Sequence, residues 1–287
     1  MMRRLLLLFL PAALALAGCK EAQDPRVMAR EVPERADDFV FENDLVAGRF
    51  YGEALEGETT SPGLDIWVKL PGRLVADEWY AKAVEEPGYY HHDHGGKDCY
   101  KVGVSLGGGA SVPFIDGRLC WPATNYRSGE ILEVSPDKIV FSLHYPAWEA
   151  AEGVPVSLDK RVTVEAGSYF IKVEDTYRFT GADSITVAAG VKLHGDQDTI
   201  VEKLEAADRI ALWEKASDQG SEPEDGLIGV AVVMPEADSV LFSGELDHAL
   251  LTKRIPSGGT VSYQAGSCWS KGDMKDAAAW FDFVRKQ

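Results

Sequence analysis

The sequence has few basic residues for its number of acidic ones, and this imbalance narrows the classes of function. It contains 29 Lys and Arg against 46 Asp and Glu, which gives a formal net charge of -17 at pH 7. Nucleic-acid binding needs a basic face for the phosphates, so we expect no nucleic-acid partner. Hydrophobic residues make up 45% and charged residues 26% of the 287 positions, which is typical of a folded globular protein and excludes a disordered chain.

Cysteine is also scarce. The chain has four cysteines and no CxxC motif, which argues against a cysteine-ligated metal site. Cys19 follows the N-terminal signal sequence described below and is expected to carry a lipid. That leaves Cys99, Cys120 and Cys268, so one of these three has no partner within the chain. A Cys99–Cys120 disulfide bond is compatible with an oxidising compartment, but the sequence leaves it open.

Two common catalytic loops are missing. The glycines at 107–109 lack the GxxxxGK[ST] pattern of a phosphate-binding loop, and no helical pattern follows them. Ser105 and Ser111 lack the GxSxG context of a serine hydrolase. The sequence therefore gives no support for a nucleotide-binding protein and little for a serine hydrolase.

The only long hydrophobic run lies at the N-terminus. Arg3 and Arg4 precede an apolar stretch over residues 5–16, and the sequence then reads Leu16-Ala17-Gly18-Cys19. A charged start, a short apolar core and small residues are typical of a secretory signal that is too short to span a bilayer. The small residues before the cysteine resemble the bacterial lipoprotein box, and the alternative is an ordinary cleaved signal with a chance cysteine.

The lipoprotein resemblance implies a specific processing and location. Residues 1–18 would be a signal peptide, and Cys19 would be lipidated and become the mature N-terminus. Lys20 after the cysteine favours the outer membrane, facing the periplasm or the cell surface. We therefore expect an exported lipoprotein that contacts the membrane through its lipid anchor only. The polar residues 19–38 are predicted to be a tether, and residues 39–287 a single domain.

Period-two alternation of apolar and polar residues dominates this domain and predicts antiparallel β-strands. The clearest examples are residues 64–70, 138–145, 169–180 and 185–194, and further candidates are 45–51, 154–164, 210–213, 227–233, 239–242 and 260–263. Helical spacing is rare: it predicts a short helix over 76–85 and a C-terminal helix capped by Asp273.

About a dozen strands in one domain of this length require two packed sheets, and a curved all-β sandwich is the natural solution. Trp67, His144, Lys192 and His194 lie on the more polar faces of their predicted strands. Such a face can form a sugar-binding groove, or it can simply be solvated. Because all four lie on such faces, the sequence slightly favours a sugar-binding site over a merely solvated surface.

A histidine-rich segment is the most distinctive feature of the chain. Three of the six histidines lie in Tyr89-Tyr90-His91-His92-Asp93-His94-Gly95-Gly96. On an extended stretch His92 and His94 point the same way, so they could supply an acid/base pair or, with Asp93, metal ligands. The segment lacks a known metal spacing such as HExxH, and a surface cluster without function is the alternative. A divalent metal is therefore left open, and the cofactor is unknown.

Several segments resemble the bacterial family described as domain of unknown function 4861, from about Phe39 to the end of the chain. The chain is one residue shorter than the family pattern near Gly96-Lys97, which leaves the alignment of His91 against His92 open. The matching segments are Glu42-Asn43-Asp44, Arg49-Phe50-Tyr51-Gly52, Asp65-Ile66-Trp67-Val68-Lys69, Tyr90-His91-His92-Asp93-His94-Gly95, Asp98-Cys99-Tyr100-Lys101-Val102-Gly103, Ser105-Leu106-Gly107, Gly190-Val191-Lys192-Leu193-His194 and Tyr263-Gln264-Ala265-Gly266-Ser267-Cys268-Trp269.

This resemblance implies an exported protein of a polysaccharide-degrading system. It implies an antiparallel β super-sandwich like that of galactose mutarotases, with a few short helices and a C-terminal helix. The implied activity is a carbon–oxygen lyase reaction, in which a terminal uronic acid of an oligosaccharide loses water and gives a 4,5-unsaturated uronyl end. The alternatives are a non-catalytic carbohydrate-binding lipoprotein and a sugar mutarotase or epimerase of the same fold.

The elimination needs a cation or metal at the carboxylate, a base for the C5 proton and an acid for the leaving hydroxyl. Histidine and tyrosine suit the proton transfers near neutral pH. The expected partner is a short uronate-containing oligosaccharide, since the negative net charge opposes a long polyanion. We predict His92 or His94 with His144 or His194 for proton transfer, Tyr90 and Tyr145 as reserve donors, Lys69, Lys101 and Lys192 as carboxylate holders, and Trp67 and Trp121 for stacking on sugar rings.

Overall fold

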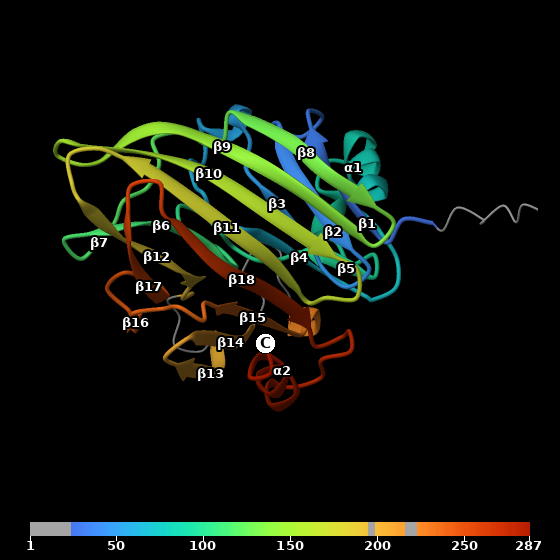
Figure 1. Ribbon diagram of the computed structural model, residues 1–287. Helices are drawn as coiled ribbons and strands as arrows, with labels where there is room; N and C mark the ends of the chain where they lie inside the picture. The colour runs from blue at the N-terminus through green and yellow to red at the C-terminus, as the bar shows by residue number, and fades with distance from the viewer. Residues whose placement is uncertain (1–23, 195–198, 216–222) are drawn as a thin grey trace, which may run out of the picture.

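The fold is an antiparallel β super-sandwich, seen in a computed structural model that describes residues 24–194, 199–215 and 223–287 (Figure 1). One eight-stranded sheet forms the first layer, and two five-stranded sheets pack on its inner face as the second. The predicted signal peptide and Cys19 lie outside the described residues. Among the helices that the structure describes, none is long and apolar enough to cross a membrane.

The eight-stranded sheet has the strand order β13-β14-β15-β18-β11-β10-β9-β8. Every neighbouring pair in it is antiparallel. Its strands are β8 (Ser128–Ser135), β9 (Lys138–Ala151), β10 (Val154–Glu165), β11 (Phe170–Phe179), β13 (Ile200–Ala206), β14 (Arg209–Lys215), β15 (Leu227–Val233) and β18 (Thr260–Trp269).

The second layer consists of two sheets joined by a parallel bridge between Leu64 and Gly107. One has the order β1-β2-β3-β4-β5 and the other β16-β17-β12-β6-β7. The first contains β1 (Val27–Val32), β2 (Asp38–Asn43), β3 (Ala47–Phe50), β4 (Asp65–Lys69) and β5 (Gly96–Asp98); the second contains β6 (Ala110–Ile115), β7 (Arg118–Leu119), β12 (Ser184–Lys192), β16 (Ser239–Ser243) and β17 (His248–Pro256).

Helical structure is limited to the periphery. The α-helices are α1 (Ala76–Glu85) and α2 (Ala277–Val284), and the short 3-10 turns are η1 (Glu53–Leu55), η2 (Tyr89–His91) and η3 (Pro223–Asp225). α1 packs on the outer side of the β1–β5 sheet, and α2 packs on β14 and β15. The helix predicted over 76–85 is confirmed. The C-terminal helix is confirmed too, but its cap is Asp276 and not Asp273, because the Asp276 carboxylate accepts the Ala279 N–H.

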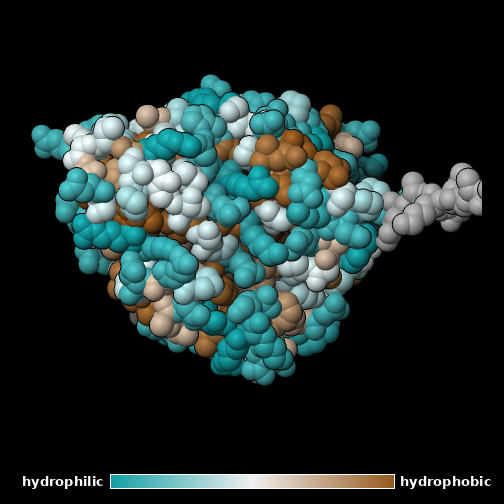
Figure 2. Space-filling model, in the orientation of Figure 1, coloured by the Kyte–Doolittle hydropathy of each residue, from teal (hydrophilic) through white to brown (hydrophobic). Residues whose placement is uncertain are grey.

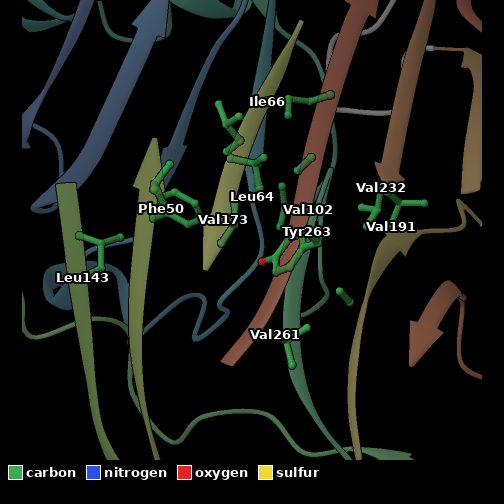
Figure 3. Close-up of a cluster of buried hydrophobic side chains, with 14 of the residues drawn as sticks. Phe50, Leu64, Ile66, Val102, Leu143, Val173, Val191, Val232, Val261 and Tyr263 are labelled. Carbon is green, nitrogen blue, oxygen red and sulfur yellow. The ribbon is translucent and has the colours of Figure 1, made fainter. Parts of the chain in front are cut away.

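The main core lies between the two layers. Alternate residues of most strands point into it, and Figure 3 shows Phe50 of the β1–β5 sheet together with Leu143, Val173 and Val232 of the eight-stranded sheet in this core. Phe39 stacks on Phe141 across the layers with ring centroids 4.5 Å apart. Each fully buried side chain of this kind stabilises the fold by about 1.5–3 kcal/mol, so the alternation that predicted the strands also explains their packing.

A polar network also lies inside this core. Lys160 Nζ lies 2.8 Å from both carboxylate oxygens of Asp175, and the Tyr263 hydroxyl donates to the same carboxylate at 3.0 Å. Ser111 donates to Asp175 and hydrogen-bonds the Tyr177 hydroxyl. These side chains are buried and are hydrogen-bonded to one another, so the network is enclosed.

The N-terminal boundary differs from the prediction. Residues 27–32, which we predicted to be part of the tether, form β1 and pair with β2 over their whole length. The reason is that Val27 and Val32 are buried against the sheet although the charged residues between them hide the pattern. The ordered fold therefore begins before the predicted boundary at residue 39.

Candidate functional site

The outer face of the β1–β5 sheet concentrates charged side chains. Asp38, Arg49, Asp65 and Asp98 lie on one face of four neighbouring strands, and each is at most 3% exposed. The Arg49 guanidinium nitrogens lie 2.8 Å from Asp65, 2.8 Å from Asp98 and 3.5 Å from Asp38. Arg35 adds a second cation 3.6 Å from Asp38. This face therefore holds two guanidinium groups among three carboxylates.

Aromatic rings from three elements cover these charges. Trp67 of β4 stacks on Tyr90 of η2 with ring centroids 5.2 Å apart and on Trp79 of α1 at 5.5 Å. The Arg49 guanidinium carbon lies 5.3 Å from the Trp67 ring and 5.4 Å from the Tyr90 ring, within the range of cation–π attraction. Trp67 is 1% exposed, so the prediction that it stacks on a sugar ring is wrong. The alternation placed it on the polar face, but α1 covers that part of the face.

Glu42 attaches α1 to the sheet. Its carboxylate accepts the N–H groups of Val75 and Ala76 at 2.8 Å, at the start of the helix where a negative charge is stabilising. The same carboxylate lies 3.2 Å from Lys69 Nζ, which also donates to the Arg73 carbonyl. The Lys69 side chain is fully buried in this arrangement. Its predicted role as a carboxylate holder for a ligand is therefore contradicted by its burial.

A pocket of about 400 Å³ opens beside the charged face, between the β1–β2 turn, η1, α1 and η2. Its polar lining residues are Glu34, Arg35, Glu58, Tyr80 and Tyr90, and the rest of the lining is apolar. Arg35 Nε donates to the Tyr90 hydroxyl at 3.3 Å. A volume of this size with a few convergent polar groups is typical of small-molecule sites. Tyr90, a predicted proton donor, therefore lies in a pocket.

The polar groups behind this pocket are incompletely hydrogen-bonded within the described part of the chain. The Tyr80 hydroxyl, Arg49 Nη1 and both Asp38 carboxylate oxygens are buried and lack full hydrogen-bond geometry. Tyr80 interacts with Arg49, and Asp38 with the Gly52 backbone N–H, so these contacts are weak but present. Burial raises the pKa of Asp38 to about 6, and Arg49 and Arg35 limit the rise. Burial also raises the pKa of Tyr80, so its hydroxyl stays protonated at neutral pH. Such a cluster favours a polar ligand or ordered water at the site.

Asp93 of the histidine-rich segment stabilises a turn. Its carboxylate accepts the N–H groups of Gly95 at 2.9 Å and Gly96 at 3.2 Å, and it pairs with Lys271 at 2.8 Å. Gly96 has φ +152, and a side chain there would meet the Lys69 backbone, which explains the glycine. Asp93 is therefore occupied by contacts within the protein.

The neighbouring histidines do not converge on a ligand. The His94 ring stacks on Tyr89 with centroids 3.8 Å apart, and its Nε2 lies 3.1 Å from the Tyr89 carbonyl. His92 is exposed. Over residues 24–194, 199–215 and 223–287, no group of three His, Cys, Asp or Glu is arranged to hold a metal. The metal ligands suggested for His92, Asp93 and His94 are therefore not gathered in the structure.

His144 and Tyr145 point to opposite faces of β9. His144 lies on the outer face of the eight-stranded sheet, where its Nδ1 is 2.7 Å from Asp159, which also pairs with Arg178. Tyr145 is 0% exposed inside the main core. The predicted roles of His144 in a shared cavity and of Tyr145 as a proton donor to a ligand are contradicted by these positions.

His194 lies in a third environment. Its Nδ1 is 2.9 Å from the Glu214 carboxylate and its Nε2 is 2.8 Å from the Lys101 carbonyl, while its ring contacts Tyr100 edge-on. Burial raises the pKa of Glu214, and His194 opposes the rise. Both ring nitrogens are occupied, so neither faces a ligand. The described contacts do not bring His92, His94, His144 and His194 together, and the prediction that they share one cavity is wrong.

His248 was not predicted, although it lies next to His194. It pairs with Lys192 in the β12–β17 register, and its ring lies 5.7 Å from that of Trp121. Its Nε2 accepts the Leu106 N–H at 3.1 Å and its Nδ1 bonds the Leu246 carbonyl, which fixes the neutral tautomer. Burial lowers the pKa of His248. No motif marks this residue, and only the strand register places it here.

Lys101, Lys192 and Trp121 remain candidates for ligand contact. Lys101 is exposed, and the half-buried Lys192 donates to the Val102 carbonyl at 3.1 Å. Burial and the nearby Lys101 lower the pKa of Lys192. Neither lysine has an ion-pair partner among the residues that the structure describes. Trp121 is half-buried, so part of its ring is accessible.

The cysteines do not form the bridge that the sequence left open. Cys120 carries a free thiol, so Cys99 and Cys120 are not joined. Cys268 is buried, and burial raises its pKa, which makes it unreactive.

The chain is similar to proteins with solved structures at low sequence identity. It matches a GH36 α-galactosidase from Geobacillus stearothermophilus with 12% identity and a TM-score of 0.41, covering 85% of this chain and 41% of that one. It matches a putative aldose 1-epimerase from Escherichia coli K12 with 9% identity and a TM-score of 0.34, covering 85% of this chain and 99% of that one.

Sequence comparison is more informative. The chain is 31% identical over 273 residues to the uncharacterized protein P7 of Formosa agariphila, which covers 90% of this chain. It spans 66% of the length of that relative. The model of a family described as domain of unknown function matches residues 17–287, nearly the whole chain. The predicted resemblance is confirmed, and this chain belongs to the DUF4861 family.

Proposed function

We propose that this protein is a carbohydrate-active lyase that removes water from a terminal uronic acid of an oligosaccharide bound in the pocket beside α1. The observation that carries the proposal is the contact of Arg35 with Tyr90 on the wall of a pocket of about 400 Å³. This pair places a permanent cation next to a phenol, and the elimination needs both a carboxylate holder and a proton donor. The DUF4861 resemblance, which links the family to polysaccharide-degrading systems, supports the choice of substrate.

Each group has a role in the elimination. Arg35 binds the substrate carboxylate and stabilises the charge that develops when the C5 proton leaves. A pocket carboxylate, Glu34 or Glu58, accepts that proton. Tyr90 donates a proton to the C4 hydroxyl as its bond to carbon breaks. The C5–H and C4–O bonds break, the C4–C5 double bond forms and water leaves, so the step balances without a redox partner.

The groups behind the pocket position the reacting ones. Asp38 contacts Arg35 but does not line the pocket, so it acts through the guanidinium. Tyr80 lines the pocket with its ring, while its hydroxyl is buried towards Arg49; its ring packs edge-on against Tyr90 with centroids 5.9 Å apart, so it positions Tyr90. This arrangement replaces the imidazole acid/base pair that the sequence suggested.

The test uses saturated-end uronic oligosaccharides and the variant Tyr90→Phe. Wild-type protein is expected to generate the ultraviolet absorbance of the new double bond and a product lighter by one water. Loss of general acid catalysis should lower the rate by about 10²–10⁴-fold, while calorimetry should still detect binding. Tyr89→Phe is the matched control, because Tyr89 is adjacent in sequence but does not line the pocket, and it should retain the wild-type rate.

Three results separate the alternatives. Binding by the wild type without any product on a broad oligosaccharide panel would contradict the lyase and favour a binding protein. A change of anomer ratio without loss of mass would favour a mutarotase. Equal rates for Tyr90→Phe and Tyr89→Phe would remove the reaction from this pocket.

A further inference from the structure

The two edge strands of the eight-stranded sheet, β13 and β8, expose different kinds of side chain. The β13 edge exposes one apolar side chain, Val201, next to the charged Glu202 and Lys203, and such charges are the usual protection of an edge strand. The β8 edge exposes three apolar side chains together with Glu130 and Glu133: Ile131 is 38% exposed, Leu132 43% and Val134 69%. An unpaired apolar edge is normally covered, because it otherwise promotes aggregation.

The charges next to this apolar row are partly paired. Glu133 pairs with Lys138 at 2.8 Å, and Asp137 pairs with Arg26 at 3.1 Å, although Arg26 also pairs with Asp44. Glu130 of β8 is exposed and has no ion-pair partner among the described residues, so the strip keeps some negative charge. Figure 2 shows a hydrophobic patch on this side of the molecule, where Figure 1 places the end of β8. Three exposed apolar side chains on one edge strand suit an apolar partner and not a polyanion.

The chain enters the fold beside the same strip. The Arg26 N–H donates to the Pro136 carbonyl at 2.7 Å, and Val134 lies two residues before Pro136. The predicted lipid-bearing Cys19 precedes Arg26 by seven residues, which can span at most about 25 Å. A domain of this size is about 45 Å across. A bilayer that holds Cys19 must therefore face the half of the molecule around Pro136.

The sequence alone predicts membrane contact through the lipid anchor only. We infer a second contact: the β8 edge, with Ile131, Leu132 and Val134, is the surface that rests on the lipid bilayer when the chain is anchored through Cys19. The occupant is the bilayer interface, because the anchor can reach this edge and cannot bring the β13 edge to the membrane.

The experiment uses the full, acylated protein reconstituted in phosphatidylcholine vesicles that contain brominated acyl chains. Val134→Trp places a fluorophore on the β8 edge, and Val201→Trp places one on the β13 edge, where Val201 is 49% exposed. The wild-type signal of the seven native tryptophans is subtracted. We expect the added Val134→Trp fluorescence to be quenched at least about two-fold more than that of Val201→Trp, since bromine quenches only groups in contact with the acyl chains.

Several outcomes would overturn the inference. These are equal quenching at both positions, stronger quenching of Val201→Trp, and protein that does not float with the vesicles. A concentration-dependent blue shift of Val134→Trp without vesicles, together with a dimer mass, would assign the edge to a second copy instead. None of these readouts involves the pocket, so failure of the proposed lyase activity leaves the test intact.

Discussion

Two buried polar networks in this protein have similar compositions and different degrees of completion. The network around Lys160 and Asp175 lies between the two layers of the sandwich, and its side chains are hydrogen-bonded to one another. The network around Arg49 and Asp38 lies on the outer face of the β1–β5 sheet, and several of its buried atoms lack full hydrogen-bond geometry. The second borders the pocket beside α1.

The difference shows what distinguishes a structural network from a candidate site. Both networks contain fully buried ion pairs and buried tyrosines, so burial and charge alone do not separate them. When all polar atoms of a network are hydrogen-bonded within the protein, no donor or acceptor is left to bind a ligand. A network with unsatisfied atoms beside a cavity can gain hydrogen bonds from a bound molecule, which is why we assign function to the face that carries Arg49.

The largest expected effect comes from breaking the enclosed network. Lys160→Met leaves the Asp175 carboxylate buried without its cation, and we expect a loss of about 3–5 kcal/mol in the free energy of unfolding. Urea denaturation followed by circular dichroism measures it. The double variant Lys160→Met/Asp175→Leu should lose less, because it removes the stranded charge. If Lys160→Met alone had wild-type stability, the Lys160–Asp175 ion pair would not be buried as described.

The second prediction concerns the pH dependence that Asp38 confers. Burial raises its pKa from 3.8 to about 6 in the folded protein, so between these values the folded state binds more protons than the unfolded state. The free energy of unfolding that Asp38 contributes is therefore greatest below pH 4 and is lost as the pH rises through 6, by up to about 3 kcal/mol. Urea titrations from pH 4 to pH 7 measure this decline relative to Asp38→Asn.

The control for this prediction is Asp159→Asn on the outer sheet face. Asp159 is partly exposed and pairs with His144 and Arg178, so its removal should not abolish the decline. A stability difference between wild type and Asp38→Asn that does not change with pH would contradict the raised pKa. That result would mean that Asp38 is more exposed to water in solution than it is in the structure.

Local patterns predicted much of this fold. The alternation in residues 64–70 and 138–145 predicts β4 and β9 because one face of each strand lies in the main core. The helix over Ala76–Glu85 follows from its own spacing. β1 was missed because it is an edge strand with only two buried apolar residues, so its sequence resembles a charged tether.

The candidate site was harder to predict because its contacts join distant residues. Trp67 lies on the polar face as predicted, but no local pattern reveals that α1 folds back over it. Lys69 pairs with Glu42, and Arg49 pairs with Asp98, which lies 49 residues further along the chain. Tyr90 was predicted from its chemistry, whereas Arg35 was overlooked in the segment predicted to be a tether. The histidine prediction failed because it required His92 or His94 to meet the distant His144 or His194, and no local pattern reports such a contact.

The prediction with the smallest expected effect compares one buried tyrosine hydroxyl from each network. The Tyr263 hydroxyl donates to Asp175 at 3.0 Å, while the buried Tyr80 hydroxyl interacts with Arg49 without full hydrogen-bond geometry. Tyr263→Phe should therefore cost about 1.5–3 kcal/mol of unfolding free energy, since it removes a hydrogen bond to a charged group. Tyr80→Phe should cost less, about 0.5–1 kcal/mol, because its hydroxyl interacts with Arg49 without full hydrogen-bond geometry. Both rings are almost fully buried, so the two variants differ mainly in hydrogen bonding. Equal losses in urea denaturation would mean that Tyr80 is hydrogen-bonded in solution and that the polar groups beside the pocket are as complete as those of the core.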